Sequence, residues 1–304
     1  MNKFKNMKNF LWCVEPLPKN TEFEKSSVKT INKITTAFSS TITPVSYVSD
    51  FNPITREGLC RNEKDQILES ISERLKEYKI KRLGGAKVIY DFAEGLVSKQ
   101  VSLIINYAEK NNFGIICVQT KAKSSRDKLF LGSFAETLSL TSVKVPILTI
   151  NPTSSFSALR KLLIPIDFTG SYKQFFKKVT NLCAEVKAKL ICYYVVPTPS
   201  GSSILTRATK REIEDIAEAN LKRHRKEIKE LEKISADAKI KFTFVSVNSS
   251  KQSVSQDIIS FAKENEVDLI AVQGHAGKAR GFLLGSTSRQ VIRSAHCPVL
   301  VMHD

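Results

Sequence analysis

Short apolar runs alternate with longer amphipathic segments throughout the second half of the chain. Short apolar runs are typical of parallel strands buried on both faces, and the segments between them have the spacing of helices that cover a sheet. Strands are expected at residues 162–166, 190–196, 242–247, 269–273 and 298–302. Helices are expected at residues 172–187, 209–238, 253–265 and 286–294. This alternation predicts a doubly wound α/β sheet.

The first half repeats the second. Its strands are expected at residues 10–14, 43–48, 87–90, 115–119 and 146–150. Four segments recur, namely 10–15 with 162–167, 114–120 with 268–274, 129–133 with 282–286 and 145–150 with 297–302. Their offsets are 152, 154, 153 and 152 residues, and chance similarity does not hold one register over such a length. We therefore predict two tandem α/β domains, residues 1–152 and 153–304, each with a five-stranded parallel sheet and helices on both faces. The Ser-rich segment 151–158 is the expected linker.

The composition sets the class of protein. With 304 residues, 42% of them hydrophobic and 25% charged, the chain is long and apolar enough for two globular domains. No apolar run approaches the roughly 18 to 20 residues that cross a bilayer, and the start lacks a signal-peptide core. A cytoplasmic protein without a membrane segment is expected. Cys13, Cys117 and Cys192 lie in apolar runs and are expected to be reduced core residues. No ligand cluster for a metal is evident.

The formal net charge of +17 raises the possibility of a polyanionic partner. However, the basic residues of segment 207–233 alternate with acidic ones, which is typical of a solvated helix face. Nucleic-acid binding is therefore not the favoured interpretation.

Ligands of open parallel sheets bind at the carboxyl ends of the strands, where the topology reverses. Two loops of the second half occupy such positions, at residues 167–171 and 274–288. The second contains Gly274 and Gly277 and leads to Gly285, after which a helix begins. Glycines allow the backbone to approach phosphate oxygens, and a helix N-terminus favours an anion. Ser286, Thr287 and Ser288 also suit helix capping, so this pattern alone leaves both interpretations open.

The segment GHAGKARGFLLGSTS (274–288), followed by VIRSAHCPVLVM (291–302), resembles the C-terminal signature of the universal stress protein family. LLIPIDF (162–168) resembles the first strand of that family, and the likeness extends more faintly over residues 8–151. The resemblance implies a Rossmann-like fold of the adenine nucleotide alpha hydrolase type. It also implies a role in the stress response.

ATP-binding members of the family look like G-x2-G-x9-G followed by Ser or Thr, with an Asp at the end of the first strand near adenine. The resemblance therefore implies ATP, with Mg as a possible counterion and no protein-ligated metal. The cofactor-binding residues that it implies are Asp167, Val195, Gly274, Gly277, Gly285, Ser286, Thr287 and Ser288. This chain departs from the pattern, because seven residues separate Gly277 from Gly285, two fewer than in the family. Lys278 and Arg280 lie in this shortened loop.

The first half has lost most of the pattern. Thr120 and Lys123 occupy the glycine positions, Glu15 replaces the Asp, and only Gly132 and Ser133 remain. We predict no nucleotide in this half. The basic residues of its loop, Lys121, Lys123, Arg126 and Lys128, fit either an anion or partner contact or a solvated loop.

Three functions stay open. The first is a stress-response regulator that binds ATP or a related adenine nucleotide in the C-terminal domain and contacts an unknown protein partner. The second is slow ATP hydrolysis, although no general base is evident, so no catalytic residue is assigned. The third is a scaffold without nucleotide. Family members look like dimers built through the last strand. We therefore predict an intramolecular pseudo-dimer through residues 146–150 and 298–302, with a homodimer as a further possibility.

Overall fold

The computed structural model describes residues 8–14, 21–49, 59–91, 96–122, 129–130, 133–141, 144–151, 156, 158–196, 210–249, 253–274 and 285–303. In the first half the elements are β1 (Asn9–Cys13), α1 (Thr21–Ala37), β2 (Thr41–Ser49), α2 (Leu59–Glu77), β3 (Lys87–Asp91), α3 (Val97–Lys110), β4 (Ile115–Gln119), β5 (Lys121–Ala122), β6 (Leu129–Phe130), α4 (Ser133–Leu140) and β7 (Ile147–Ile150). In the second half they are β8 (Lys161–Pro165), α5 (Tyr172–Val186), β9 (Lys189–Val196), α6 (Lys210–Arg223), α7 (Arg225–Asp237), β10 (Phe242–Asn248), α8 (Val254–Glu264), β11 (Leu269–Gly274), α9 (Ser286–Ser294) and β12 (Val299–His303).

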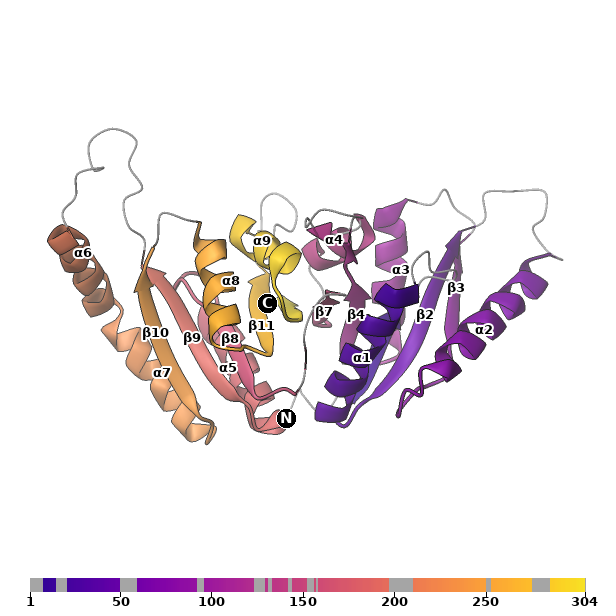
Figure 1. Ribbon diagram of the computed structural model, residues 1–304, viewed down its shortest axis with the longest axis horizontal. Helices are drawn as coiled ribbons and strands as arrows, with labels where there is room; N and C mark the ends of the chain where they lie inside the picture. Colours follow the sequence, from indigo (N-terminus) through magenta and orange to yellow (C-terminus); the bar gives the residue numbers. More distant parts are fainter. Residues whose placement is uncertain are drawn as a thin grey trace.

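Ten strands form one twisted sheet in the order β10-β9-β8-β11-β12-β7-β4-β1-β2-β3 (Figure 1). Each half contributes five strands in the spatial order 3-2-1-4-5, and neighbours within a half are parallel. This is the doubly wound α/β fold that the apolar runs predict. The strand order reverses between the first and fourth strands of each half, which places a topological switch point between β8 and β11 and another between β1 and β4.

The two halves join through an antiparallel pair of their last strands, β7 and β12, which we call the seam. Leu148 lies opposite Leu300, and these two residues occupy equivalent positions in the repeat, so the local twofold axis passes between them. Polar contacts reinforce the seam. The Thr149 hydroxyl donates to the Val299 carbonyl oxygen at 3.2 Å, and the Asn151 amide donates to the Ala295 carbonyl oxygen at 3.1 Å. The predicted pairing within one chain is therefore present, while the predicted boundary at residues 152–153 lies outside the described residues.

Helices cover both faces of the sheet. One apolar core contains side chains of α1, α2, α5, α6 and α7, and the other contains side chains of α3, α4, α8 and α9. Each core includes residues of both halves and is therefore continuous across the seam. Trp12 in β1 is 1% exposed and belongs to the first core. Because strands buried on both faces need apolar side chains in both directions, the continuous apolar runs of the sequence are explained.

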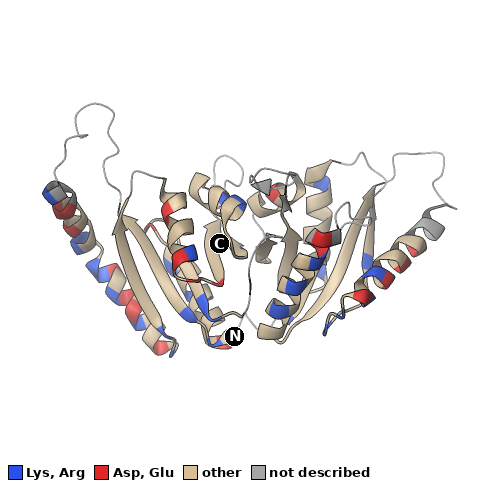
Figure 2. Ribbon diagram, viewed as in Figure 1, with Lys and Arg blue, Asp and Glu red and all other residues tan. Residues whose placement is uncertain are grey.

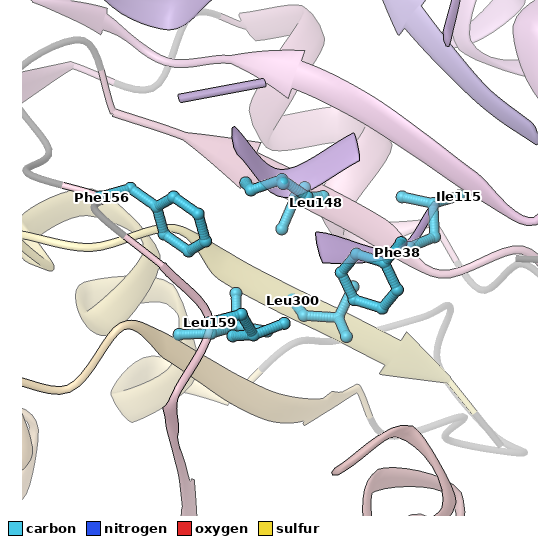
Figure 3. Close-up of a pocket in the computed structure, with 8 residues that line it drawn as sticks. Phe38, Ile115, Leu148, Phe156, Leu159 and Leu300 are labelled. Carbon is cyan, nitrogen blue, oxygen red and sulfur yellow. The ribbon is translucent and has the colours of Figure 1, made fainter. Parts of the chain in front are cut away.

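A cavity of about 10 Å³ lies beside the seam, within the first core (Figure 3). Its walls are entirely apolar and come from both halves and the segment between them: Ile34, Phe38, Ile115, Leu148, Phe156, Leu159, Leu269 and Leu300. This volume is near the minimum that holds one water molecule, and the walls offer water no hydrogen-bonding partner. The cavity is therefore a packing gap where the halves meet, and it is far too small for a nucleotide.

Local interactions fix the starts of two elements. The buried Asp268 carboxylate accepts hydrogen bonds from the backbone N–H groups of Arg160 and Lys161, both at 2.8 Å, and so holds the first residue of β8 beside β11. Ser253 and Gln256 form a capping box at the start of α8. The Asp268 contact lies at the amino ends of β8 and β11, whereas the capping box lies after the carboxyl end of β10.

Two features differ from the sequence-based expectations. The helical segment expected at residues 209–238 is divided at His224 into α6 and α7, and a small hairpin, β5–β6, follows β4. Neither was predicted, and the cause of the first becomes apparent at the site. Five cysteines whose side chains the structure describes are free, with Cys117, Cys183, Cys192 and Cys297 buried and Cys13 partly exposed. Within the described residues, no helix has the length and apolar character needed to span a bilayer.

Candidate functional site

The switch point of the second half lies between the carboxyl ends of β8 and β11. The ladder between these strands contains two residue pairs, Leu162 with Leu269 and Leu163 with Ile270. In the first half, the equivalent ladder between β1 and β4 contains four pairs. Near the carboxyl ends of β8 and β11, the Gln273 side chain donates to the Ser171 hydroxyl at 2.7 Å and bridges the two strand ends. The pairing of the central strands is thus shorter in the half that keeps the glycine loop.

Asp167 lies in the exposed turn that follows β8. Its Oδ1 accepts hydrogen bonds from the backbone N–H of Thr169 at 2.9 Å and from the Thr169 hydroxyl at 2.8 Å. These bonds hold a tight turn in which Gly170 has φ 62°. Because a carboxylate oxygen has more than one acceptor site, Asp167 retains capacity for a further donor such as an adenine amino group.

Phe168 occupies an unusual backbone conformation for a bulky residue, with φ 59°. Its ring stacks on the His224 imidazole, with centroids 4.5 Å apart and planes at 12°. Tyr194 and Tyr172 meet the same ring edge to face at 5.1 and 5.6 Å. This packing compensates for the strained backbone and draws His224 inward, which accounts for the division between α6 and α7.

The electrostatics of this cluster connect it to the turn. Burial raises the pKa of the Tyr194 hydroxyl. The guanidinium of Arg223 opposes this rise, while the Asp167 carboxylate adds to it. Tyr194 therefore stays protonated and neutral near pH 7, close to the carboxyl end of β9.

Gly274, the last residue of β11, lies opposite His303 of β12. A Cβ atom at position 274 would lie 2.3 Å from both Cε1 and Nδ1 of His303. The imidazole thus fills the space that a side chain would need, and His303 is only 6% exposed. Packing within the protein explains why residue 274 is glycine. This glycine is therefore no independent sign of a phosphate loop.

Gly285 presents the opposite case. It is the N-cap of α9, with φ −57° and ψ 153°, a conformation open to every residue type. A Cβ atom at this position would meet no described atom within 4 Å. Neither backbone strain nor packing in the described part of the chain accounts for this glycine. The open space in front of it is where a ligand would approach the backbone.

The N-terminus of α9 has the character of an anion site. Its first backbone hydrogen bond runs from Arg289 N–H to the Gly285 carbonyl oxygen at 3.0 Å, so the N–H groups of Ser286, Thr287 and Ser288 precede the helical ladder. The structure shows no side-chain cap at this end. Ser286 is exposed, and Thr287 and Ser288 are partly exposed. N–H groups that precede the helical ladder and the positive end of the helix dipole favour an anion here.

Some of the predicted site residues lie in the core or outside the described residues. Val195 lies near the end of β9 but is only 8% exposed, so its side chain belongs to the core rather than to an open site. Gly277, Lys278 and Arg280 lie outside the described residues. In the described part of the chain, no group of three or more His, Cys, Asp or Glu side chains is arranged to hold a metal ion.

The first half is closed at the corresponding place. Thr120, which stands where the second half has Gly274, is 2% exposed, and its hydroxyl donates to the Ile150 carbonyl oxygen at 3.3 Å. Its side chain thus fills the end of β4. Glu15 and Lys123 lie outside the described residues.

Sequence reasoning missed several residues that shape the site. His303 and His224 are separated from their partners by many residues, and no local pattern connects Gly274 to His303 or Phe168 to His224. Glu136 of α4 also lies beside the site, because it forms an ion pair with Arg293 of α9 at 2.6 Å. The repeat contained a usable signal for it, since aligning the two halves places an acid at the fourth position of α4 and Arg289 at the fourth position of α9.

Comparison with known proteins relates the second half of the chain to one family. The model of the universal stress protein family matches residues 158–303. Universal stress protein MJ0531 of Methanocaldococcus jannaschii is 28% identical over 145 residues, which cover 47% of this chain and 81% of that protein.

Solved structures share the fold over the whole chain. A universal stress protein from Archaeoglobus fulgidus has a TM-score of 0.68 at 17% identity, with 98% of each chain covered. A putative universal stress protein from Pseudomonas aeruginosa has a TM-score of 0.59 at 14% identity, covering 99% of this chain and 95% of that one. At such low identity these likenesses establish the tandem arrangement of the fold alone. The second half, residues 158–303, therefore matches the universal stress protein family, and the solved structures show that the same fold extends over both halves.

Proposed function

We propose that the second half binds ATP or a related adenine nucleotide, and that the protein acts in the stress response as a nucleotide-dependent regulator or binding protein. The observation that carries the proposal is the N-terminus of α9, where a Cβ at Gly285 would meet no described atom within 4 Å and three N–H groups precede the helical ladder. Phosphate oxygens are the natural ligands of such a helix end.

The position of this helix end supports the proposal. It belongs to the same half as the switch point between β8 and β11, where ligands of doubly wound sheets bind. Asp167 follows the strand on the other side of that switch point and retains acceptor capacity for an adenine amino group. The family match adds weight, because it covers this half of the chain.

The same reasoning assigns no nucleotide to the first half. Thr120 fills the end of β4, and the longer ladder between β1 and β4 keeps the central strands paired further along. A phosphate group needs the backbone to come close, and a buried, hydrogen-bonded threonine occupies that space.

Efficient ATP hydrolysis is not part of the proposal. Hydrolysis needs a group that positions or activates the attacking water. The Asp167 carboxylate already accepts two hydrogen bonds from Thr169 and holds the turn. We assign it to ligand binding, and we expect phosphate release to stay at the level of a variant that does not bind nucleotide.

Calorimetric titration of the full-length protein with Mg-ATP tests the proposal, after chromatography of any nucleotide that co-purifies. One site per chain is expected for the wild type and for Gly132→Val, the equivalent change in the first half. Gly285→Val should lose the site, because its side chain would enter the free space in front of α9. At an ATP concentration 100 times Kd, binding would add about 2.7 kcal/mol to the free energy of unfolding.

The outcomes separate the open interpretations. Loss of binding in Gly132→Val but not in Gly285→Val would move the site to the first half and refute the assignment. Absence of heat, of co-purified nucleotide and of thermal stabilisation at millimolar ATP would favour a scaffold without nucleotide.

A further inference from the structure

An ion-pair cluster crosses the seam and ends on the helix assigned to phosphate. Helices α4 of the first half and α9 of the second lie beside each other at the centre of the molecule (Figure 1). Figure 2 shows an acidic position on α4 and basic positions on α9. Glu136 Oε1 lies 2.6 Å from Arg293 Nη2 and 4.0 Å from Arg289 Nε. The carboxylate of one half therefore faces two guanidinium groups of the other.

The two arginines are held unequally. The contact with Arg293 is a short charge-assisted hydrogen bond, whereas 4.0 Å is too long for a hydrogen bond to Arg289. Arg289 Nε is buried and has no hydrogen-bond acceptor in the described part of the chain. Its side chain as a whole is 35% exposed, so the guanidinium is near solvent. Arg289 thus lacks a hydrogen bond at Nε within the described residues, and its side chain can change position without breaking one there.

Arg289 is also close to the proposed anion site along the chain. It is the fourth residue of α9, and its own N–H makes the first bond of the helix. Side chains of a helix lean toward its N-terminus, so Arg289 leans toward the N–H groups of Ser286–Ser288. A guanidinium in this position suits a phosphate oxygen.

The cluster depends on the divergence of the two halves. Glu136 is the fourth residue of α4, and its equivalent in the repeat, 153 positions later, is Arg289 itself. Two identical halves would place like charges at these positions, on either side of the local twofold axis. Glu136 of the first half therefore supplies a negative charge where the second half has the positive charge of Arg289.

We propose that Glu136 regulates the affinity of the second half for phosphate by competing with the ligand for Arg289. This inference rests on the proposed function. In the absence of ligand, Glu136 attracts Arg289, and a bound phosphate takes Arg289 over while Glu136 keeps Arg293. Through this exchange the first half, which has no predicted ligand, acts as a positioning device for the site in the second.

The proposal predicts opposite effects for the two partners of one ion pair. Glu136→Gln removes the competitor, so the affinity for Mg-ATP and for inorganic tripolyphosphate should rise about two- to fivefold, the scale of a partly exposed charge contact. Arg293→Gln releases Glu136 to bind Arg289 more tightly, so both affinities should fall by a similar factor. Both variants lose the same 2.6 Å contact. A purely structural role for that contact would change the two affinities in the same direction.

Calorimetric titration of the full-length variants tests this, with melting temperatures measured alongside. Glu109→Gln, an exposed acid on α3 of the same half, is the control for net charge and should leave the affinities unchanged. In an Arg289→Gln background, Glu136→Gln should have no further effect. Equal gains with and without Arg289, or shifts of the same sign for Glu136→Gln and Arg293→Gln, would overturn the inference.

These outcomes separate this inference from the proposed function. Wild-type binding of Mg-ATP without a gain in Glu136→Gln refutes the role of Glu136 alone. The predicted pattern with tripolyphosphate, together with no binding of Mg-ATP, supports the role of Glu136 and refutes the adenine nucleotide. Failure of the wild type to bind either compound refutes both.

Discussion

Two glycines of the candidate site have different causes, and replacing each by alanine separates them. At Gly274 the added Cβ would lie 2.3 Å from two atoms of the His303 ring and 3.0 Å from a third. An ordinary contact begins near 3.4 Å, so the ring or the strand must move by about 1.1 Å. His303 is buried in the last strand, and its carbonyl oxygen accepts a hydrogen bond from Lys178 at 2.9 Å, so neither shift is free.

Overpacking of this kind costs about 1 to 3 kcal/mol. In a cooperative unit of roughly 150 to 250 residues, each kcal/mol lowers the melting temperature by about 2 to 4 °C, so Gly274→Ala should melt roughly 2 to 12 °C below the wild type. At Gly285 the added Cβ meets no described atom within 4 Å, and the backbone is unstrained. Only the N-cap preference is lost, about 0.5 to 1 kcal/mol, and the lower entropy of the unfolded chain offsets part of it.

Thermal unfolding followed by circular dichroism, without ligand, measures both variants. His303→Ala in the Gly274→Ala background is the decisive control, because removing the ring removes the clash. The double variant should lose less stability than the sum of the two single variants. Gly274→Ala with wild-type stability, or strictly additive losses in the double variant, would refute the assignment of Gly274 to packing.

Two further predictions concern the frame of the second half. Asp268→Ala should lower the free energy of unfolding by about 2 to 4 kcal/mol in urea titrations, because the backbone N–H groups of Arg160 and Lys161 lose a buried, charged acceptor. A loss below about 0.5 kcal/mol would contradict this. Burial raises the pKa of the Cys183 and Cys297 thiols to about 12. Their contribution to stability is complete below pH 9 and is lost as the pH rises toward 12. Urea midpoints should therefore fall between about pH 8 and 10.5. The fall should be smaller in the double variant Cys183→Ala/Cys297→Ala. If the urea midpoint of that variant fell as much at high pH as that of the wild type, the fall would be due to other groups.

The fold was predictable because it rests on local pattern and on the repeat. Strands buried on both faces leave continuous apolar runs, and every expected strand is present within two residues of its predicted ends. The pairing of the last strands was also predictable, since the resemblance implied it. What remained hidden depends on contacts between distant residues. The division of the long helix at His224 follows from a ring stacked on Phe168, and helical spacing contains no trace of it.

The candidate site was predictable to a lesser degree, for a reason that Gly274 makes clear. A glycine in a sequence states only that a side chain is excluded, and the excluding atoms can belong to a ligand or to the protein. At Gly274 they belong to His303, whereas at Gly285 no described atom excludes a side chain. The glycine motif therefore gives no support for a phosphate site at Gly274, and the proposed site depends on Gly285.

The divergence of the halves gives the duplication a physical consequence. If both halves had stayed identical, they would place like charges at the fourth positions of α4 and α9, beside the local twofold axis. In this chain the first half has closed its strand end with Thr120 and carries an acid where the second carries Arg289. Both differences bear on the second half. Thr120 leaves the second half as the half predicted to bind nucleotide, and Glu136 places a negative charge beside α9. Loss of a ligand in one half of a fused pair thus frees its residues to modulate the other. The opposite shifts expected for Glu136→Gln and Arg293→Gln measure whether this chain has used that freedom.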